Sequence, residues 1–80
     1  MSWNYRVVKR TESVPHLGEP VISYGIHEAY YDKDGRIVGL SEQPVRIIGD
    51  LHVELYDMID RINKCFNKKT VVYETLEEII

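Results

Sequence analysis

Hydrophobic residues in the first half of the chain gather in short runs rich in β-formers, whereas in the second half they recur at helical spacing. Residues 3–8 and 20–31 are rich in β-branched and aromatic side chains, which is typical of strands. Residues 36–40 resume this pattern after a short polar segment. The stretch 11–19 contains a proline and a glycine and has no periodicity, so it is predicted to be a loop.

The polar segment between the second and third predicted strands indicates a tight hairpin. A three-residue loop, Lys33-Asp34-Gly35, would form a type I turn with Gly35 in the left-handed conformation. This loop sets a register in which Tyr31 faces Ile37, Tyr30 faces Val38, Ala29 faces Gly39, Glu28 faces Leu40 and His27 faces Ser41. Gly25 indicates a bulge or a bend within the second strand. The third strand either continues through residues 41–43 or stops before them, because Pro44 cannot donate to a ladder.

The second half of the chain carries the stripe of an amphipathic helix that ends near Asn67. Apolar residues at spacings of four, three, four and three form its core face: Leu51, Leu55, Met58, Ile62 and Cys65. Ile59 and Phe66 widen this face, and Asp50 is suited to cap the helix.

Together these elements predict an α+β fold that forms a single domain over residues 1–80. Residues 70–74 are predicted to add a short edge strand, and residues 76–80 form either a helical turn or a frayed end. The expected architecture is a three- or four-stranded antiparallel sheet with one helix packed on one face. One helix covers only one face, so some aromatic side chains of the sheet should remain uncovered.

Length, charge and cysteine content exclude several classes of protein. A chain of 80 residues has a small core and a thin stability margin. We expect neither a membrane span nor a signal peptide, because no apolar run approaches about 20 residues and the N-terminal residues lack an apolar centre. The single cysteine, Cys65, excludes an internal disulfide and suits a reducing cytoplasm. The net charge of −3 argues against nucleic-acid binding driven by overall charge.

Two motifs carry a resemblance to a known family. Residues 3–8 read WNYRVV, and residues 24–37 read YGIHEAYYDKDGRI. Together they resemble a family of small uncharacterised bacterial proteins that open with WNYRV before a YGIHE-x-YYD-x-DG hairpin and a single acidic helix. The segment 40–44 departs from that family by lacking a tryptophan, and the helix start at residues 50–52 also differs. The resemblance implies no activity, because the family has no established function.

A second resemblance is architectural. A three-stranded meander that leads through Gly49-Asp50 into one helix is similar to HicB-like antitoxins, whose N-terminal part is a truncated RNase-H-like fold. Leu51 stands where those proteins have a hydroxyl residue. This resemblance implies an alternative function, that of an antitoxin or toxin-neutralising protein, and it rests on architecture alone.

The polar residues form no catalytic, cofactor-binding or metal-binding constellation, so we expect a protein that is not an enzyme and has no cofactor. His27 and Glu28 are neighbours on a strand and point to opposite faces. His27 opposite Ser41 has no oxyanion loop beside it. The three histidines lack the spacing of a metal site, and the segment 32–35 lacks the later ligands of a calcium loop.

The tyrosine-rich sheet is the feature most suggestive of function. A candidate interaction face consists of Tyr5, Tyr24, His27, Glu28, Tyr30 and Tyr31. Aromatic residues on strands stabilise the sheet itself, bury in a protein partner or, third in order, stack on nucleobases. We therefore expect a small, non-catalytic cytoplasmic interaction or regulatory module that binds another protein or forms a homodimer. Nucleic-acid binding and metal binding are the remaining alternatives.

Overall fold

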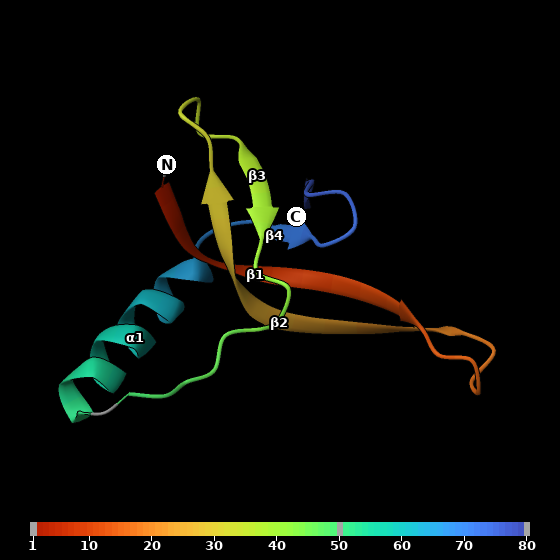
Figure 1. Cartoon of the computed structure of the whole chain (residues 1–80), viewed down its shortest axis with the longest axis horizontal. Helices are drawn as coiled ribbons and strands as arrows, with labels where there is room; N and C mark the ends of the chain where they lie inside the picture. Colours follow the sequence, from red (N-terminus) through yellow and green to blue (C-terminus); the bar gives the residue numbers. More distant parts are fainter. Residues whose placement is uncertain (1, 50, 80) are drawn as a thin grey trace.

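The computed structural model of the chain describes residues 2–49 and 51–79. Its elements are β1 (Ser2–Ser13), β2 (Pro20–Tyr31), β3 (Ile37–Leu40), α1 (His52–Cys65), β4 (Thr70–Val72) and β5 (Glu78–Ile79). Within the described residues the five strands form one sheet in the order β3-β2-β1-β4-β5, and α1 packs against β1 (Figure 1). The fold is α+β, as predicted.

β1 and β2 form a long antiparallel ribbon on which the other elements assemble. The pairing runs through all twelve residues of both strands. The turn that joins them contains Gly18 with a φ of 67°. The bounds of β2 were predicted correctly, but the first strand was predicted to cover only residues 3–8. The assignment of residues 11–13 to the loop was wrong, because pairing with β2 satisfies the backbone of a segment that has no strand periodicity of its own.

The hairpin between β2 and β3 has the predicted turn but a different register. Gly35 has a φ of 80°, and its N–H donates to the carbonyl oxygen of Asp32 over 3.1 Å. Tyr31 faces Ile37 as predicted, but Tyr30 faces Gly39 and Ala29 faces Leu40. The cause is an irregularity between Tyr30 and Tyr31, which moves every later pair by one residue.

Gly25 does not form a bulge, which was one of the two roles predicted for it. The pairing of β1 with β2 passes through Gly25 without a shift. A Cβ atom at this position would lie 3.4 Å from the Cβ of Pro44, and the next N–H along, that of Val45, donates to the carbonyl oxygen of Ile26 over 2.8 Å. Because 3.4 Å is an ordinary van der Waals distance, the position of the chain beside the edge of β2 does not itself require a glycine.

α1 is shorter than predicted. It begins at His52, with Leu51 in the N-cap position and no side-chain hydrogen bond to the cap, and it ends two residues before Asn67. The predicted cap, Asp50, lies outside the described residues.

The core face of α1 is narrower than its apolar stripe. Ile62 and Cys65 are buried, and Leu55 and Met58 are half-buried. The apolar residues Leu51, Ile59 and Phe66 are all exposed. α1 therefore presents apolar side chains that the rest of the chain does not cover.

The C-terminal part corrects the expected strand order and direction. β4 lies inside the sheet, between β1 and β5, and is not an edge strand. It runs parallel to β1, so the sheet is mixed and has five strands in the described chain instead of three or four antiparallel ones. The parallel pairing is possible because α1 forms the crossover between β3 and β4. β5 forms where a helical turn or a frayed end was expected, because β4 offers it a free edge.

Burial separates the two faces of the sheet. Arg6 and Val8 are buried and pair with His27 and Val71, which are also buried. We call the face that these residues share the buried face. The opposite face, which we call the open face, carries partly or largely exposed side chains: Trp3, Tyr5, Tyr24, Glu28 and Tyr30.

The molecule is extended for its size. The buried apolar residues of the described chain are few: Val8, Ala29, Ile62, Cys65 and Val71. The accessible surface is 6230 Å², about 1,200 Å² more than the roughly 5,000 Å² expected for a compact protein of this mass. The radius of gyration is 14.1 Å, against about 11.6 Å for a compact chain of this length. Figure 1 shows the cause: the end of the β1–β2 ribbon projects on one side and α1 on the other.

Candidate functional site

The six residues predicted to form one interaction face divide between the two faces of the sheet. Tyr5, Tyr24, Glu28 and Tyr30 lie on the open face, whereas His27 and Tyr31 lie on the buried face. Tyr24 is 66 % exposed, but His27 is only 2 % exposed. The structure therefore brings four of these residues to one face; of the other two, His27 is buried and Tyr31 is half-buried.

His27 is a structural residue of the interior. Its Nδ1 lies 2.8 Å from the backbone oxygen of Ser41, so this nitrogen donates a hydrogen bond. The Ser41 hydroxyl is 3.5 Å from the same nitrogen and donates to the carbonyl oxygen of Gln43 over 2.9 Å. The His27 ring also packs against Tyr73, with 5.9 Å between centroids. The predicted cross-strand pairing of His27 with Ser41 is wrong, because the register shift sets Ser41 beside Glu28, whose carbonyl oxygen accepts from the Ser41 N–H over 2.8 Å. His27 and Ser41 are nevertheless in contact, but they do not form a base–nucleophile pair in this arrangement.

Glu28 has a polar partner on the open face. The Tyr30 hydroxyl donates to Glu28 Oε1 over 3.4 Å. Partial burial and the nearby Glu28 carboxylate raise the pKa of Tyr30. This pair is a polar feature of an otherwise aromatic open face.

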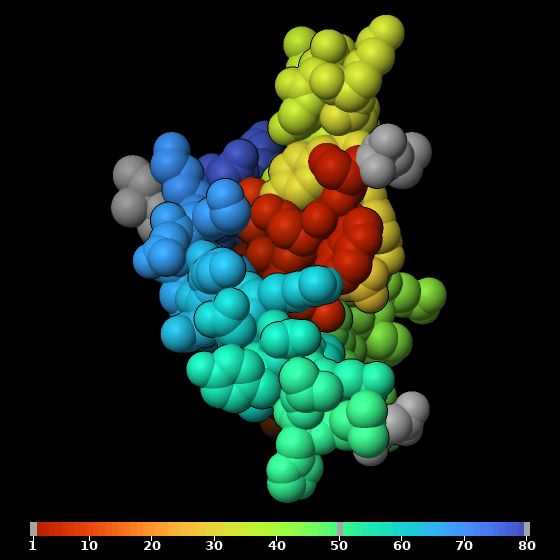
Figure 2. Space-filling model, turned by 90° about the vertical axis from the view of Figure 1, so that its left-hand side faces the viewer, coloured from red at the N-terminus to blue at the C-terminus, as the bar shows by residue number. Residues whose placement is uncertain are grey.

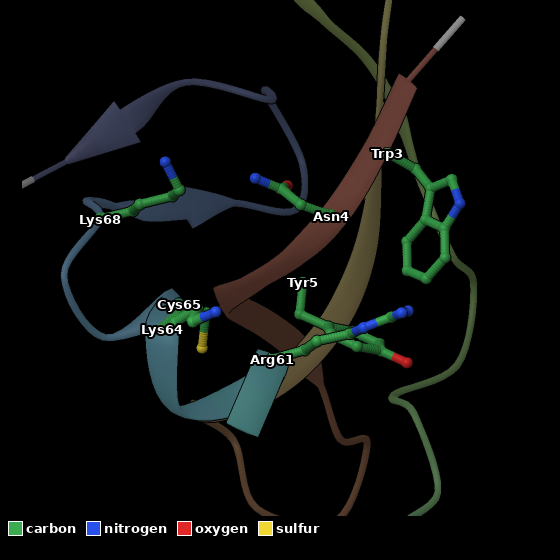
Figure 3. Close-up of a pocket in the computed structure, with 7 residues that line it drawn as sticks. All are labelled: Trp3, Asn4, Tyr5, Arg61, Lys64, Cys65 and Lys68. Carbon is green, nitrogen blue, oxygen red and sulfur yellow. The ribbon is translucent and has the colours of Figure 1, made fainter. Parts of the chain in front are cut away.

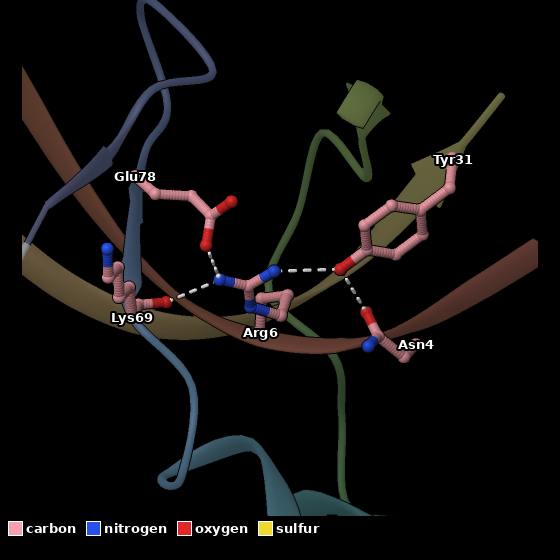
Figure 4. A network of polar contacts seen from close by, with 5 residues as sticks. All are labelled: Asn4, Arg6, Tyr31, Lys69 and Glu78. Atoms are coloured by element: carbon pink, nitrogen blue, oxygen red, sulfur yellow. Dashed lines mark hydrogen bonds and ion pairs between the residues drawn. The ribbon is translucent and has the colours of Figure 1, made fainter. Parts of the chain in front are cut away.

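Arg6 organises a polar network on the buried face (Figure 4). Its guanidinium donates to the Tyr31 hydroxyl over 2.8 Å and, through Nη2, to the Lys69 carbonyl and to Glu78 Oε2, each over 2.7 Å. The Tyr31 hydroxyl in turn donates to Asn4 Oδ1 over 2.7 Å. The network ties β1 to β2 and to β5. The sequence contained no signal for it, because the partners lie 25 to 72 positions from Arg6 along the chain.

The Arg6–Glu78 pair makes stability depend on pH. The hydrogen bond from Arg6 lowers the pKa of Glu78, which is about 4.3 in an unfolded chain. A lowered folded-state pKa stabilises the fold above the unfolded pKa, and this contribution is lost as pH falls through the folded value. Since the Glu78 side chain is 47 % exposed and its charge is screened by solvent, we expect the pair to contribute only about 1 kcal/mol to the free energy of unfolding. The Tm difference between the native chain and Glu78→Gln should be present at neutral pH and should vanish below about pH 3. A difference that does not change with pH would contradict this role of Glu78.

A pocket of about 420 Å³ opens between the start of β1 and the C-terminal half of α1 (Figure 3). We call it the basic pocket, and its lining residues are Trp3, Asn4, Tyr5, Arg61, Lys64, Cys65 and Lys68. Three of them are cations, and no described carboxylate lines the pocket. Cys65 is 1 % exposed, and burial raises the pKa of its thiol, so the thiol is an uncharged part of the wall.

The flank of α1 away from the basic pocket is exposed and apolar. Figure 2 shows α1 on the surface, with the start of β1 beside it. Tyr56, Ile59 and Phe66 are 75 %, 51 % and 64 % exposed. Together with Asn63, which is also exposed, we call these residues the helix seam. The prediction that Ile59 and Phe66 belong to the core was wrong: only Ile62 and Cys65 of the apolar stripe are buried, and Ile59 and Phe66 lie beside that pair on the exposed flank of α1.

Other site types find no support in the described chain. Within residues 2–49 and 51–79, no three His, Cys, Asp or Glu side chains are grouped so that they could hold a metal ion. None of the described helical segments has the length and apolar character that crossing a membrane requires. No protein-family model, curated protein or solved structure matches this chain.

Proposed function

We propose that this chain is a small, non-catalytic protein-interaction module of the cytoplasm that works as a homodimer formed through α1. The observation that carries the proposal is the large apolar surface. Among the described residues, thirteen large hydrophobic side chains are exposed and only five apolar residues are buried. The surface in excess of a compact monomer is about 1,200 Å² and is shared between α1 and the projecting end of the β1–β2 ribbon.

The helix seam has the spacing of a helix–helix contact. Tyr56, Ile59, Asn63 and Phe66 follow one another at intervals of three, four and three residues, as do the a and d positions of a coiled coil. An asparagine at one a position selects a register and an oligomeric state at some expense of stability. Apolar residues at this spacing stabilise a helix–helix contact, but they contribute no stability on a surface that contacts only water.

A hollow in the helix seam also supports contact with a second copy of α1. It has a volume of about 190 Å³ and is lined by Tyr56, Ile59, Asp60 and Asn63. These are the four positions i, i+3, i+4 and i+7 of one helix, the set that receives a side chain in knobs-into-holes packing. A second copy of α1 would supply such a side chain.

The helix dipole of α1 favours an antiparallel pair. A two-fold axis across the seam sets the N-terminus of each helix beside the C-terminus of its partner, so the two dipoles oppose each other. A parallel pair would bring the like ends of the two dipoles together.

The test is the mass of the full chain as a function of concentration, measured by sedimentation velocity. We expect twice the 9.4 kDa of one chain, with a dissociation constant of micromolar order or tighter. A folded monomer that persists at about 1 mM would overturn the proposal.

Disulfide trapping tests the orientation of the two helices. In the antiparallel pair, Tyr56 lies opposite Phe66 of the partner subunit. Chains with Tyr56→Cys and chains with Phe66→Cys should therefore form a mixed disulfide when combined and oxidised. A Tyr56→Cys homodisulfide formed faster than the mixed one would show a parallel pair. The native Cys65 does not compete, because it is buried.

A further inference from the structure

The basic pocket has an aromatic end. The rings of Trp3 and Tyr5 pack edge to face, with 5.3 Å between centroids and an interplanar angle of 84°. Both lie on the open face of β1, and Trp3 remains 45 % exposed. Figure 3 shows the Arg61 side chain extending in the same direction as Tyr5, beneath the Trp3 indole. Two ring systems and a guanidinium plane form a wall on which a flat aromatic group can stack.

The other end of the pocket is cationic. Lys64 and Lys68 line it beside Asn4 and the buried Cys65, and Figure 3 shows them on the side away from Trp3. Arg61 and Lys64 lie one turn apart on α1, and Lys68 follows three residues after α1 ends, so three positive charges line the same pocket and repel one another. Lys64 has an ion pair with Asp60 at 3.4 Å, but Arg61 has none within residues 2–49 and 51–79. This concentration of positive charge occurs in a chain whose net charge is −3.

The arrangement matches one class of small molecule. A bound anion would relieve the repulsion among the three cations, and the Asn4 amide can donate or accept a hydrogen bond beside it. A volume of about 420 Å³ lies within the range of pockets that hold small ligands. We propose that the basic pocket binds a small anion that carries an aromatic ring, of the size and chemistry of a nucleoside monophosphate. The ring lies against Trp3 and Tyr5, and the phosphate lies near Lys64 and Lys68.

This site is independent of the proposed dimer. The pocket residues Arg61 and Lys64 lie on the flank of α1 opposite the seam residues Ile59 and Asn63. A dimer formed through the seam therefore leaves the pocket open. The two proposals can fail separately.

The experiment is a binding titration of the full chain followed by tryptophan fluorescence, because Trp3 is its single tryptophan. The probes are adenosine 5′-monophosphate, adenosine and inorganic phosphate. We expect the nucleotide to bind at least about tenfold more tightly than either part alone, with affinity that falls as salt rises. Equal affinity for phosphate and nucleotide, equal affinity for adenosine and nucleotide, or no binding of the nucleotide would each overturn the proposal.

Variants locate the binding. Lys68→Gln should weaken nucleotide binding about tenfold, whereas Lys33→Gln, which removes a lysine from the exposed β2–β3 turn, should not change it. Trp3→Leu should weaken nucleotide binding to a similar extent. Since this variant lacks the tryptophan, its binding is measured from the NMR shifts of the Arg61 side chain. Equal effects of Lys68→Gln and Lys33→Gln would show non-specific attraction and overturn the assignment. Affinity for short RNA that rises with its length beyond that of the mononucleotide would replace the small ligand with a nucleic acid and would also overturn it.

Discussion

Arg6→Ala is expected to lower the free energy of unfolding by about 3 kcal/mol, the largest loss of any single polar residue in this chain. The guanidinium is 4 % exposed and makes hydrogen bonds to Tyr31, Lys69 and Glu78. Hydrogen bonds of a charged group contribute about 1.5–3 kcal/mol each. The loss in Arg6→Ala is smaller than the sum of these contributions, because the Glu78 carboxylate regains hydrogen bonds to water. A chain of this length has a total stability of only about 4–12 kcal/mol. The expected fall in Tm is about 12–24 °C.

Arg10→Ala is the matched control, because Arg10 lies on the same strand and the same face as Arg6. Arg10 pairs with Glu12 at 3.2 Å and lies over the Tyr73 ring at 4.2 Å, but it is more exposed than Arg6. We expect Arg10→Ala to lower the free energy of unfolding by only about 1 kcal/mol. Arg6→Lys should fall between the two, since it keeps the charge but not the planar fork. Thermal unfolding followed by circular dichroism at one fixed protein concentration measures all three variants. Equal losses for Arg6→Ala and Arg10→Ala would show that the Arg6 network is not a major support of the fold.

The features predicted correctly from sequence are those specified by neighbouring residues. Gly35 adopts the positive φ that the hairpin turn requires, and a dense run of β-formers gives β2 its bounds. The spacing of apolar residues in α1 identifies the buried pair Ile62 and Cys65. In each case the physical cause lies within a few residues of the effect.

The features that were missed depend on residues far apart in the chain. The register beyond Tyr30 is set by an irregularity that no motif marks, and the pairing of β4 with β1 requires the crossover through α1. The role of Arg6 depends on Glu78, which lies 72 positions away along the chain. The basic pocket forms only because α1 places Arg61 next to Trp3. Sequence reasoning could find excess aromatic residues but could not assign their neighbours.

Ile59→Asp is expected to weaken the dimer about 100-fold, which corresponds to about 2.8 kcal/mol. Ile59 is the central apolar residue of the helix seam and lines its hollow. A carboxylate there would lose its hydration in the interface without a cation opposite, since Asn63 of the partner subunit would face it. The fold of one chain should survive, because Ile59 is half exposed and its side chain is not part of the described core.

Val38→Asp provides the matched control for this prediction. Val38 lies on β3, away from the seam, and has the same exposed fraction as Ile59, 51 %. Sedimentation should show a monomer for Ile59→Asp at concentrations where Val38→Asp remains a dimer. Because a dimer stabilises its folded subunits by mass action, the Tm of the native chain should rise with concentration, whereas that of Ile59→Asp should not. A dimer of unchanged affinity in Ile59→Asp would mean that the contact lies elsewhere, on the open face of the sheet or along the β1–β2 ribbon.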